Sequence, residues 1–510
     1  MKKLLKILFS RLVFVALFMI LQLLSILAAL TYFRDNVTAF YSIFIVLSLI
    51  VVVYILNSDG NAAFKIAWII PIIVLPIFGT PLYFMFGKTK LTKTQRKKVY
   101  AIQSKHDSSM ALISSRNSEL AAQSVDAALQ SRYLEHAAIA PVYNRTSTEF
   151  FPLGDVMYPK MLSELKKAEH FIFLEYFIVQ PGKMWDAMLD ILLEKVAAGV
   201  DVRLIYDDMG SILTLPRNYC ARLEARGIKC CVFRRFQPVL SGSFNNRDHR
   251  KICVIDGDTA FTGGINLADE YINAFPKHGH WSDCGVMLKG DAVFSFTAMF
   301  LSMWDYIRKQ DEDFSAFAPR PEKLPEQGDG FVQPFSDSPM DNEAVGETAY
   351  INMISHAKRY VYITTPYLVI DSELMNALTT AAKCGVDVRI MTPGIPDKWY
   401  VFAVTRSYYS TLIRAGVRIF EYTPGFMHAK TFVADDEYAI CGTINLDFRS
   451  LFLHYECAAW MFRSKAVPSM VDSFLNNQAL CAEITDDYCR SRSWLLRLTQ
   501  SLLRVFAPMM

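Results

Sequence analysis

Residues 249–256 read His-Arg-Lys-Ile-Cys-Val-Ile-Asp, and residues 428–435 read His-Ala-Lys-Thr-Phe-Val-Ala-Asp. Both stretches are H-x-K-x4-D, with mostly apolar residues between the Lys and the Asp. The likeness continues past the Asp, because Gly-Gly-Ile-Asn at 263–266 and Gly-Thr-Ile-Asn at 442–445 each place an Asn seventeen residues after the His. One such match in a chain of this length has a chance probability of roughly a few per cent. Two matches with matching tails indicate an internal duplication.

The composition favours a membrane-associated protein with large folded domains. The chain has 510 residues, enough for two or three domains, and 52% of them are hydrophobic. The formal net charge of +3 is too small to predict a nucleic-acid partner. The ten cysteines form no C-x-x-C pair, and several lie in apolar runs. We therefore expect reduced core cysteines on the cytosolic side, and neither a zinc site nor a disulfide scaffold.

Three apolar stretches, Leu12–Phe33, Phe40–Leu56 and Ile66–Phe86, occupy the N-terminal region. The first has about 20 residues, enough to cross a bilayer as a helix, and its apolar core is too long for a signal peptide. The third contains three prolines, so it can span, kink or re-enter. Six basic residues at 88–98 follow it and predict a multi-pass protein of the cell membrane with a cytoplasmic catalytic region. By the same rule the basic N-terminus is also predicted on the cytoplasmic side. Three full spans would place the N-terminus and residues 88–98 on opposite sides of the membrane, so they cannot satisfy both predictions.

Strand and helix patterns recur in the same order ahead of both motifs. In each repeat an apolar strand, a helix ended by Gly and a second strand are predicted. They are 171–178, 184–198 and 200–206 in the first repeat, and 360–365, 373–383 and 386–391 in the second. The same five-residue sequence, Gly-Val-Asp-Val-Arg, occurs at both 199–203 and 385–389. A duplicated unit of about 180 residues predicts two α/β domains with largely parallel sheets that share one site.

These patterns divide the chain into six segments. They are a first transmembrane segment (1–36), membrane-anchoring segments two and three (37–98), a connector (99–130), a first repeat domain (131–325), a second repeat domain (326–480) and a C-terminal amphipathic segment (481–510). The Pro-, Glu- and Gly-rich stretch 319–330 is the predicted linker between the repeats. The C-terminal segment either lies on the bilayer or packs on the domain.

The repeated motif supplies groups that suit a reaction at an anionic phosphorus centre. On a regular strand, His and Lys of H-x-K lie on one face. If the repeats pack about a pseudo-two-fold axis, one cavity receives His249, Lys251, Asn266, His428, Lys430 and Asn445. Lys and Asn would hold the non-bridging oxygens, one His would attack phosphorus, and the other would protonate the leaving oxygen. The two Lys ammonium groups can stabilise the negative charge of the phosphate as a metal ion would, so neither a metal nor a cofactor is predicted.

A nucleophilic His must be neutral, with its other ring nitrogen held by a fixed carboxylate. Asp283 and Glu456 occupy matching places in the two repeats and are the candidates for this role. Asp256 and Asp435 come five residues after the Lys, where they fix a turn in the alternative interpretation. Glu175, in an apolar strand, is either functional or a structural acid.

These motifs resemble those of the phospholipase D superfamily, whose hallmark is the duplicated H-x-K-x4-D followed by G-x-x-N. The resemblance narrows to bacterial cardiolipin synthases and spans roughly residues 40–510. It rests on Asp248–Gly257, Gly263–Asn266, Tyr271, Met427–Lys430, Asn445–Ser450, Phe171–Ile178, Thr365–Tyr367 and Ala67–Gly87. The chain departs from the family at three places. Asp248 stands where Asn is usual and adds negative charge, Ser282 stands where Arg is usual, and Leu12–Phe33 is an extra segment.

The resemblance implies a transphosphatidylation that joins two phosphatidylglycerol molecules into cardiolipin and glycerol through a phosphohistidine. It implies phosphatidylglycerol, other anionic phospholipids and the membrane as partners, with no nucleic acid. We favour His249 as nucleophile and His428 as acid/base. The predicted catalytic residues are His249, Lys251, Asp256, His428, Lys430 and Asp435, with Asn266, Asn445, Asp283 and Glu456 binding phosphate or supporting the site.

Other functions share parts of this pattern. A hydrolytic phospholipase D shares the first half-reaction, and another phosphatidyltransferase differs only in its acceptor. No residue of the sequence identifies that acceptor. A membrane-tethered nuclease is disfavoured by the near-neutral charge, and an inactive scaffold by the two intact motifs.

Overall fold

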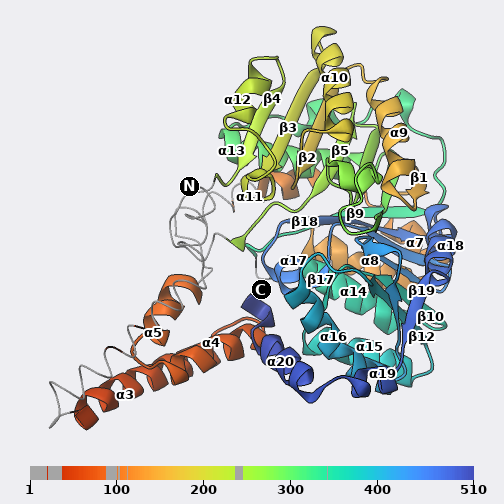
Figure 1. Ribbon diagram of the computed structural model, residues 1–510. Helices are drawn as coiled ribbons and strands as arrows, with labels where there is room; N and C mark the ends of the chain where they lie inside the picture. The colour runs from red at the N-terminus through yellow and green to blue at the C-terminus, as the bar shows by residue number, and fades with distance from the viewer. Residues whose placement is uncertain are drawn as a thin grey trace. The chain divides into compact units, whose positions relative to one another are not determined.

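Each copy of the motif lies in its own mixed β-sheet. The computed structural model describes residues 20, 24, 37–87, 100, 104–111, 113–235, 245–341 and 343–509 (Figure 1). Within them the first sheet has seven strands, in the order β1-β8-β6-β5-β2-β3-β4. Their bounds are β1 Thr146–Phe151, β8 Gly285–Gly290, β6 Thr259–Gly263, β5 Lys251–Ile255, β2 Phe171–Tyr176, β3 Asp201–Asp207 and β4 Lys229–Phe233.

The second sheet repeats this order and adds one edge strand. Among the described residues it has eight strands, in the order β19-β13-β12-β10-β15-β16-β18-β9. Read from β9, the first seven match β1 to β4 of the first sheet one by one, so the duplication is one of topology. The bounds are β19 Cys481–Ile484, β13 Arg418–Tyr422, β12 Asp387–Pro393, β10 Tyr360–Thr364, β15 Thr431–Ala434, β16 Tyr438–Gly442, β18 Glu456–Phe462 and β9 Phe331–Asp337.

The expectation of largely parallel sheets is wrong. Within the two large sheets, as far as they are described, only β2-β3-β4 and β10-β12-β13 run parallel, and the strands that carry the motifs, β5 and β15, are antiparallel to both neighbours. The physical reason is the short connection after each motif, residues 256–258 and 435–437. Three residues can join antiparallel strands, whereas a parallel crossover needs a dozen or more.

Helices cover the outer faces of the sheets and also fill the space between them. The predicted helices are present as α10 (Lys183–Ala197) and α15 (Ser372–Lys383). Between the sheets lie α13 (Val293–Arg308) and α18 (Ala466–Gln478), which contact strands of both repeats. Nearly every residue of α13 is buried, as expected for a helix that is apolar on all sides. The largest apolar core therefore joins the two repeats.

The other helices and two short sheets complete the repeats. The helices are α7 Asn117–Gln123, α8 Val125–Ala137, α9 Gly154–Leu165, α11 Asp208–Ser211, α12 Tyr219–Glu224, α14 Val345–His356, α16 Trp399–Arg414, α17 Phe448–Phe452, α19 Asp486–Ser491 and α20 Trp494–Val505. The short sheets pair β7 (His280–Ser282) with β14 (Gly425–Met427), and β11 (Leu368–Val369) with β17 (Leu446–Asp447).

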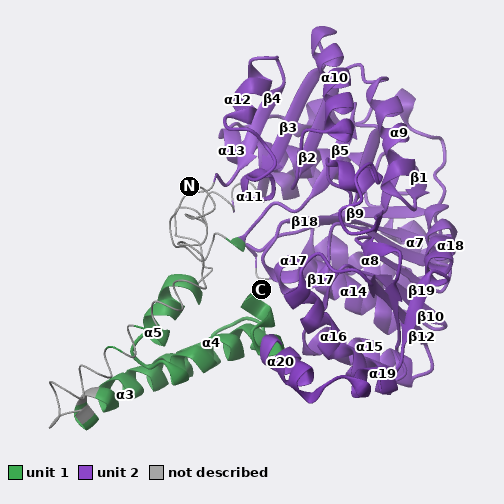
Figure 2. Ribbon diagram, in the orientation of Figure 1, with its two compact units in different colours: residues 1–92, 236–245, 504–510 green, residues 93–235, 246–503 purple. Residues whose placement is uncertain are grey.

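The chain forms two compact units (Figure 2). Both repeats belong to the unit of residues 93–235 and 246–503, and the other unit consists of 1–92, 236–245 and 504–510. In that N-terminal unit, α3 (Val37–Leu56) carries no charged residue and exposes most of its apolar side chains. It contacts α4 (Ala62–Val74), which contains Pro71 and is followed by α5 (Gly79–Leu82) and a π-helical turn at Tyr83–Gly87.

The predicted membrane segments are only partly described. The second and third apolar stretches correspond to α3 and to α4 through the π-helical turn. Of the first stretch only Ile20 and Leu24 are described, and the whole basic cluster at 88–98 lies outside the described residues. Across the described part of the chain, no helix combines the length and the apolar character needed to cross a membrane.

Candidate active site

Two short backbone pairings bring each motif to the acid of the other repeat. Strand β14, which ends just before His428, pairs in parallel with β7, which ends just before Asp283. The His428 N–H donates to the carbonyl of Ser282 at 2.7 Å. In the matching place the His249 N–H donates to the carbonyl of Tyr455 at 2.9 Å, one residue before Glu456. Each half of the site is thus built from both repeats.

Each imidazole contacts one of the predicted carboxylates. His249 Nδ1 lies 2.9 and 3.0 Å from the two carboxylate oxygens of Glu456. Glu456 is fully buried and also accepts hydrogen bonds from the hydroxyls of Ser450 (2.5 Å) and Thr443. His428 Nδ1 lies 2.5 Å from Asp283 Oδ2, and Asp283 is likewise fully buried. The carboxylates fix both rings and leave the Nε2 atoms for chemistry.

Burial makes both imidazoles neutral. It lowers the pKa of His249 to about 3, against the opposing charge of Glu456. The pKa of His428 is lowered well below its usual range by burial and by the charges of Lys430 and Lys251. Burial raises the pKa of Asp283 to about 7, although Lys430 opposes this. A neutral His with Nδ1 held by a carboxylate is the form that can attack phosphorus.

The two motif lysines are buried cations. Lys251 and Lys430 are almost inaccessible to solvent, and each ammonium donates to the carbonyl of its own motif His. Burial lowers the pKa of Lys251 to about 7 and that of Lys430 to about 8. Burying an ammonium is costly without a counter-charge. An anion between the two lysines would supply that charge, so the site favours an anionic ligand.

The two asparagines of the G-x-x-N tails are also buried, with different partners. Asn266 accepts from Ile178 N at 3.1 Å and donates to the Tyr271 hydroxyl at 2.7 Å. The side-chain oxygen of Asn445 has no hydrogen-bond partner among the described residues. Asn266 therefore fixes the loop after β2, while in Asn445 the NH2 group is the part of the amide that can donate to an anionic ligand.

Asp256 and Asp435 lie at the other end of their strands. Each begins a tight turn with a positive φ, 53° at Asp256 and 58° at Asp435. Asp256 accepts from the N–H groups of residues 169–171, and Asp435 from those of residues 358–360. Five strand residues put them about 16 Å from the Lys. This geometry favours the alternative interpretation, in which they fix a turn.

His454 belongs to the site and was missed from the sequence. Its ring centroid lies 5.5 Å from that of His249, and its Nδ1 lies 3.6 Å from Glu456 Oε1. Both ring nitrogens are buried and make no hydrogen bond to the described residues. His249, His454 and Glu456 could together hold a metal ion, but the nearby ammonium of Lys251 opposes a cation there. The matching residue is Trp281, whose centroid lies 5.5 Å from His428. Because the equivalent residue is a tryptophan, the repeat carries no signal for this histidine.

The unusual Asp248 does not add charge to the reaction centre. It is fully buried, and its Oδ1 accepts from Arg250 N at 3.3 Å. The Arg250 guanidinium lies 3.6 Å from Glu175. Burial raises the pKa of Asp248 and of Glu175, and the two acids interact. The charge of Arg250 thus offsets the extra acid, which corrects the expectation of added negative charge.

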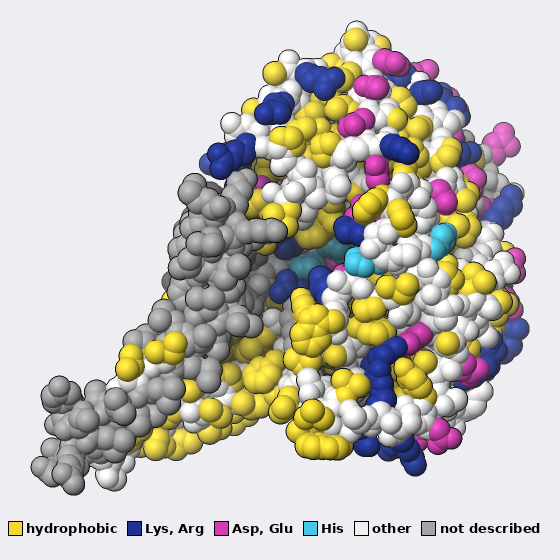
Figure 3. Space-filling view, in the orientation of Figure 1, with side chains coloured by type: hydrophobic (Ala, Val, Ile, Leu, Met, Phe, Trp, Pro, Cys, Tyr) yellow, Lys and Arg dark blue, Asp and Glu magenta, His cyan; other side chains and the backbone are white. Residues whose placement is uncertain are grey.

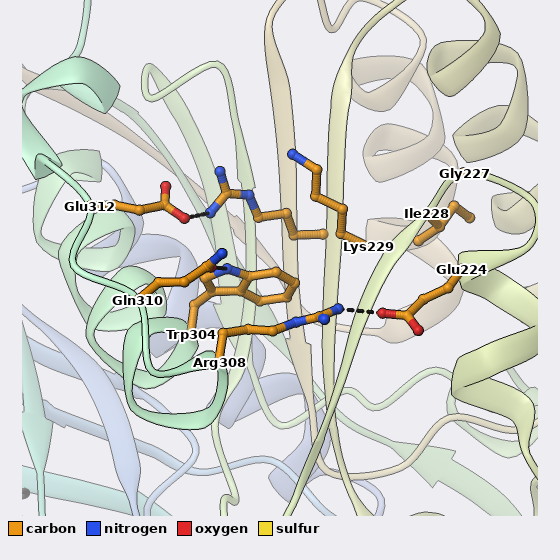
Figure 4. A pocket seen from close by; sticks show the side chains of 9 residues that line it. Glu224, Gly227, Ile228, Lys229, Trp304, Arg308, Gln310 and Glu312 are labelled. Carbon is orange, nitrogen blue, oxygen red and sulfur yellow. Dashed lines mark hydrogen bonds and ion pairs between the residues drawn. The ribbon is translucent and has the colours of Figure 1, made fainter.

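Histidine and basic side chains are visible around a hollow in the surface of the repeat unit (Figure 3). A separate pocket of about 280 Å³ is lined by Trp304, Arg203, Arg308 and Lys229 (Figure 4). Its cations are paired with carboxylates, Arg203 with Glu312, Arg308 with Glu224 and Lys229 with Asp201. The site with the two buried motif lysines therefore suits an anion better than this pocket.

Comparison with known proteins identifies the family. The model described as "Cardiolipin synthase, PLD-like domain" matches residues 161–304 and 350–477, more than half of the chain. The chain belongs to this family. The family assignment drawn from the motifs is confirmed, and the chain is an enzyme of the phosphatidyltransferase type. A "Phospholipase_D-nuclease N-terminal" model matches residues 46–88.

Relatives of the cardiolipin synthase family match nearly the whole chain. A cardiolipin synthase of Geobacillus thermodenitrificans is 32% identical over 96% of this chain and 98% of its own length. An uncharacterized protein of Streptococcus mutans is 42% identical over 90% of this chain and 99% of its own length. The crystal structure of phosphatidylserine synthase from Haemophilus influenzae has a TM-score of 0.55 at 15% identity, over 74% of this chain and 97% of that one. This last likeness shows a shared fold.

Proposed function

We propose that this protein is a cardiolipin synthase that moves the phosphatidyl group of one phosphatidylglycerol to a hydroxyl of another, with release of glycerol. The observation that carries this proposal is the pair of neutral, carboxylate-bound imidazoles flanked by two buried lysines. Named cardiolipin synthases that are 30–32% identical to nearly the whole chain support the choice of reaction.

In the first half-reaction His249 Nε2 attacks phosphorus of the donor lipid. A P–N bond forms, the P–O bond to the glycerol headgroup breaks, and the leaving oxygen takes a proton from His428. Burial keeps His428 neutral in the free enzyme, and the negative charge of a bound phosphodiester favours its protonated form. The products are a phosphatidyl-histidine at His249 and free glycerol.

In the second half-reaction a hydroxyl of a second phosphatidylglycerol gives its proton to His428 and attacks the same phosphorus. The new P–O bond forms as the P–N bond breaks, which returns His249 to its neutral form. Lys251, Lys430 and Asn445 hold the non-bridging oxygens through both steps. Glu456 and Asp283 keep each imidazole in the productive tautomer, and Asp256 and Asp435 support the strands.

We also propose that the chain is anchored in the cell membrane with its repeat domains, 131–325 and 326–480, on the cytoplasmic side. Support comes from the exposed apolar side chains of α3 and from the C-terminal α20. Trp494, Leu495, Leu498 and Leu502 of α20 are exposed while Gln500 is buried, which favours a helix lying on a bilayer over one packed on the domain. The ten cysteines, all in the described part of the chain, are free thiols.

Product analysis tests the reaction. The full-length protein in phosphatidylglycerol vesicles is expected to yield equal amounts of cardiolipin and glycerol. His249→Ala and His428→Ala are each expected to abolish both products, while His356→Ala, a control on the outer helix α14, leaves them unchanged. Phosphatidic acid as the main product would instead identify a hydrolytic phospholipase D. Unchanged turnover in either active-site variant would refute the shared site.

A further inference from the structure

An exposed aromatic patch lies at the start of α16. Trp399 is 70% exposed, and its neighbours Tyr400 and Ile395 are 37% and 40% exposed. The rings of Trp399 and Tyr400 touch edge to face, with centroids 6.0 Å apart. We name Ile395, Trp399 and Tyr400 the mouth patch. A Trp side chain that is mostly exposed to water is unusual on the surface of a soluble protein, because burial of its large apolar area is favourable.

The mouth patch is joined to the reaction centre by a short chain of contacts. Asp397 accepts a hydrogen bond from the Tyr367 hydroxyl at 2.7 Å, and the Lys398 ammonium lies 5.4 Å from the centre of the Tyr367 ring. The centroid of the Tyr367 ring lies 6.5 Å from that of Phe426, and the Phe426 centroid lies 5.7 Å from that of the His428 ring. The charges of Asp397 and Lys398 both act on the pKa of His428. The patch therefore adjoins residues that lie close to His428, and we take it to flank the opening of the site on that side.

The same surface carries a second apolar element and positive charge. Figure 3 shows hydrophobic side chains below the hollow, in the region where Figure 1 places α16 and α20. Trp494 at the start of α20 is 74% exposed. The sequence after Asp487 contains Arg490, Arg492, Arg497 and Arg504 and no acidic residue. Trp and Tyr favour the headgroup level of a bilayer, and Arg and Lys favour anionic lipid.

We propose that the mouth patch is a docking surface for a bilayer of anionic phospholipid. Contact of Trp399 and Tyr400 with the headgroup layer would hold the mouth of the site against the membrane on the side where the alcohol leaves and enters. Donor and acceptor headgroups would then reach His428 without the lipids leaving the bilayer. This inference rests on the proposed lipid substrate, and it adds a membrane contact to the anchoring by α3 and α20.

The test compares one enzyme on two forms of phosphatidylglycerol. The double variant Trp399→Ser/Tyr400→Ser of the full-length protein is assayed on phosphatidylglycerol vesicles and on dihexanoyl phosphatidylglycerol below its micelle concentration. Turnover on vesicles is expected to fall about tenfold, because two rings no longer enter the interface. Turnover of the dissolved lipid is expected to stay within about twofold. Val156→Ser, an exposed apolar position on α9, is the matched control and should change neither.

Equal losses on both lipids would show a structural role, and no loss on vesicles would show that the patch does not dock; either result overturns the proposal. A second readout does not depend on turnover. Vesicles of brominated phosphatidylglycerol are expected to quench the tryptophan emission of the His428→Ala protein more strongly than that of the same protein with Trp399→Phe. Equal quenching would also overturn docking. If quenching differs but the product is phosphatidic acid, the proposed reaction fails and the docking surface stands.

Discussion

Each proposed catalytic histidine depends on a carboxylate from the other repeat. We predict that Glu456→Gln lowers kcat by about 10²-fold or more, because an amide no longer stabilises the correct tautomer and the charge of His249. KM for phosphatidylglycerol should change little, since Glu456 lies behind the imidazole and touches no lipid. Steady-state kinetics on vesicles measures both constants. A kcat within threefold of the parent protein would show that His249 does not need this carboxylate.

The buried lysines predict a specific pH dependence. Since the pKa of Lys251 is lowered to about 7 and that of Lys430 to about 8, both lose their protons at a lower pH than a free Lys. The form proposed to bind phosphate is the protonated one, so kcat/KM should fall as the pH rises through about 7 to 8. A bound phosphodiester favours the cation, so kcat itself should fall only at higher pH.

The variant Lys251→Arg tests whether Lys251 causes the fall of kcat/KM at high pH. An Arg stays charged throughout the accessible range, so the remaining decline should move toward the pKa of Lys430. The measurement is the pH profile of kcat/KM for both proteins in the same vesicles. An identical midpoint in the variant would remove Lys251 from the assignment.

Among the residues of the site, the sequence predicts those that occur at equivalent positions in the two repeats. His249, His428 and their lysines follow from two copies of one motif, and Asp283 and Glu456 follow from equivalent places in the repeats. Which acid serves which histidine depends on the crossed pairing of β7 with β14, a contact between segments about 145 residues apart. His454 was missed because a single histidine carries no spacing signal, and its equivalent is a tryptophan.

Among the elements, the turns after the two motif strands carry a prediction of their own. Asp435→Ala removes an acceptor of three backbone N–H groups and places Ala at a φ of 58°. We expect the midpoint of thermal unfolding to fall by about 3–8 °C, while kcat of the folded protein stays within about threefold. Calorimetry and kinetics on one preparation test this, with Glu326→Ala in the exposed linker as control. A loss of kcat without a change in stability would instead support a direct catalytic role.

The sequence predicts the helices and strands before each motif better than the sheet directions. Apolar runs and Gly stops locate β2, α10, β10 and α15 to within a few residues. Strand direction is not written in those patterns, because a fully buried strand reads the same in a parallel and an antiparallel sheet. The decisive feature is the connection at 256–258, whose three residues are too few for a parallel crossover.

For the whole molecule, a site built across two repeats predicts the behaviour of a divided chain. A break between Glu326 and Gln327, in the exposed linker, should leave each fragment without activity, since neither contains both a motif histidine and its acid. Co-expression of the two fragments should restore cardiolipin formation, because the core around α13 and α18 draws on both repeats. Lipid extracts of cells that make one or both fragments provide the measurement. Activity from a single fragment would rule out the crossed arrangement.

The crossed pairing also determines when, during synthesis of the chain, the site can become complete. His249 leaves the ribosome 207 residues before Glu456, which at 5–20 residues per second is an interval of about 10–40 s. During that time His249, the proposed nucleophile, has no carboxylate to hold its ring. A chain released early would likewise be inert toward phospholipid. Activity toward phospholipid is therefore expected only after residue 456 of the 510 has been synthesised, so an unfinished chain leaves the lipids intact.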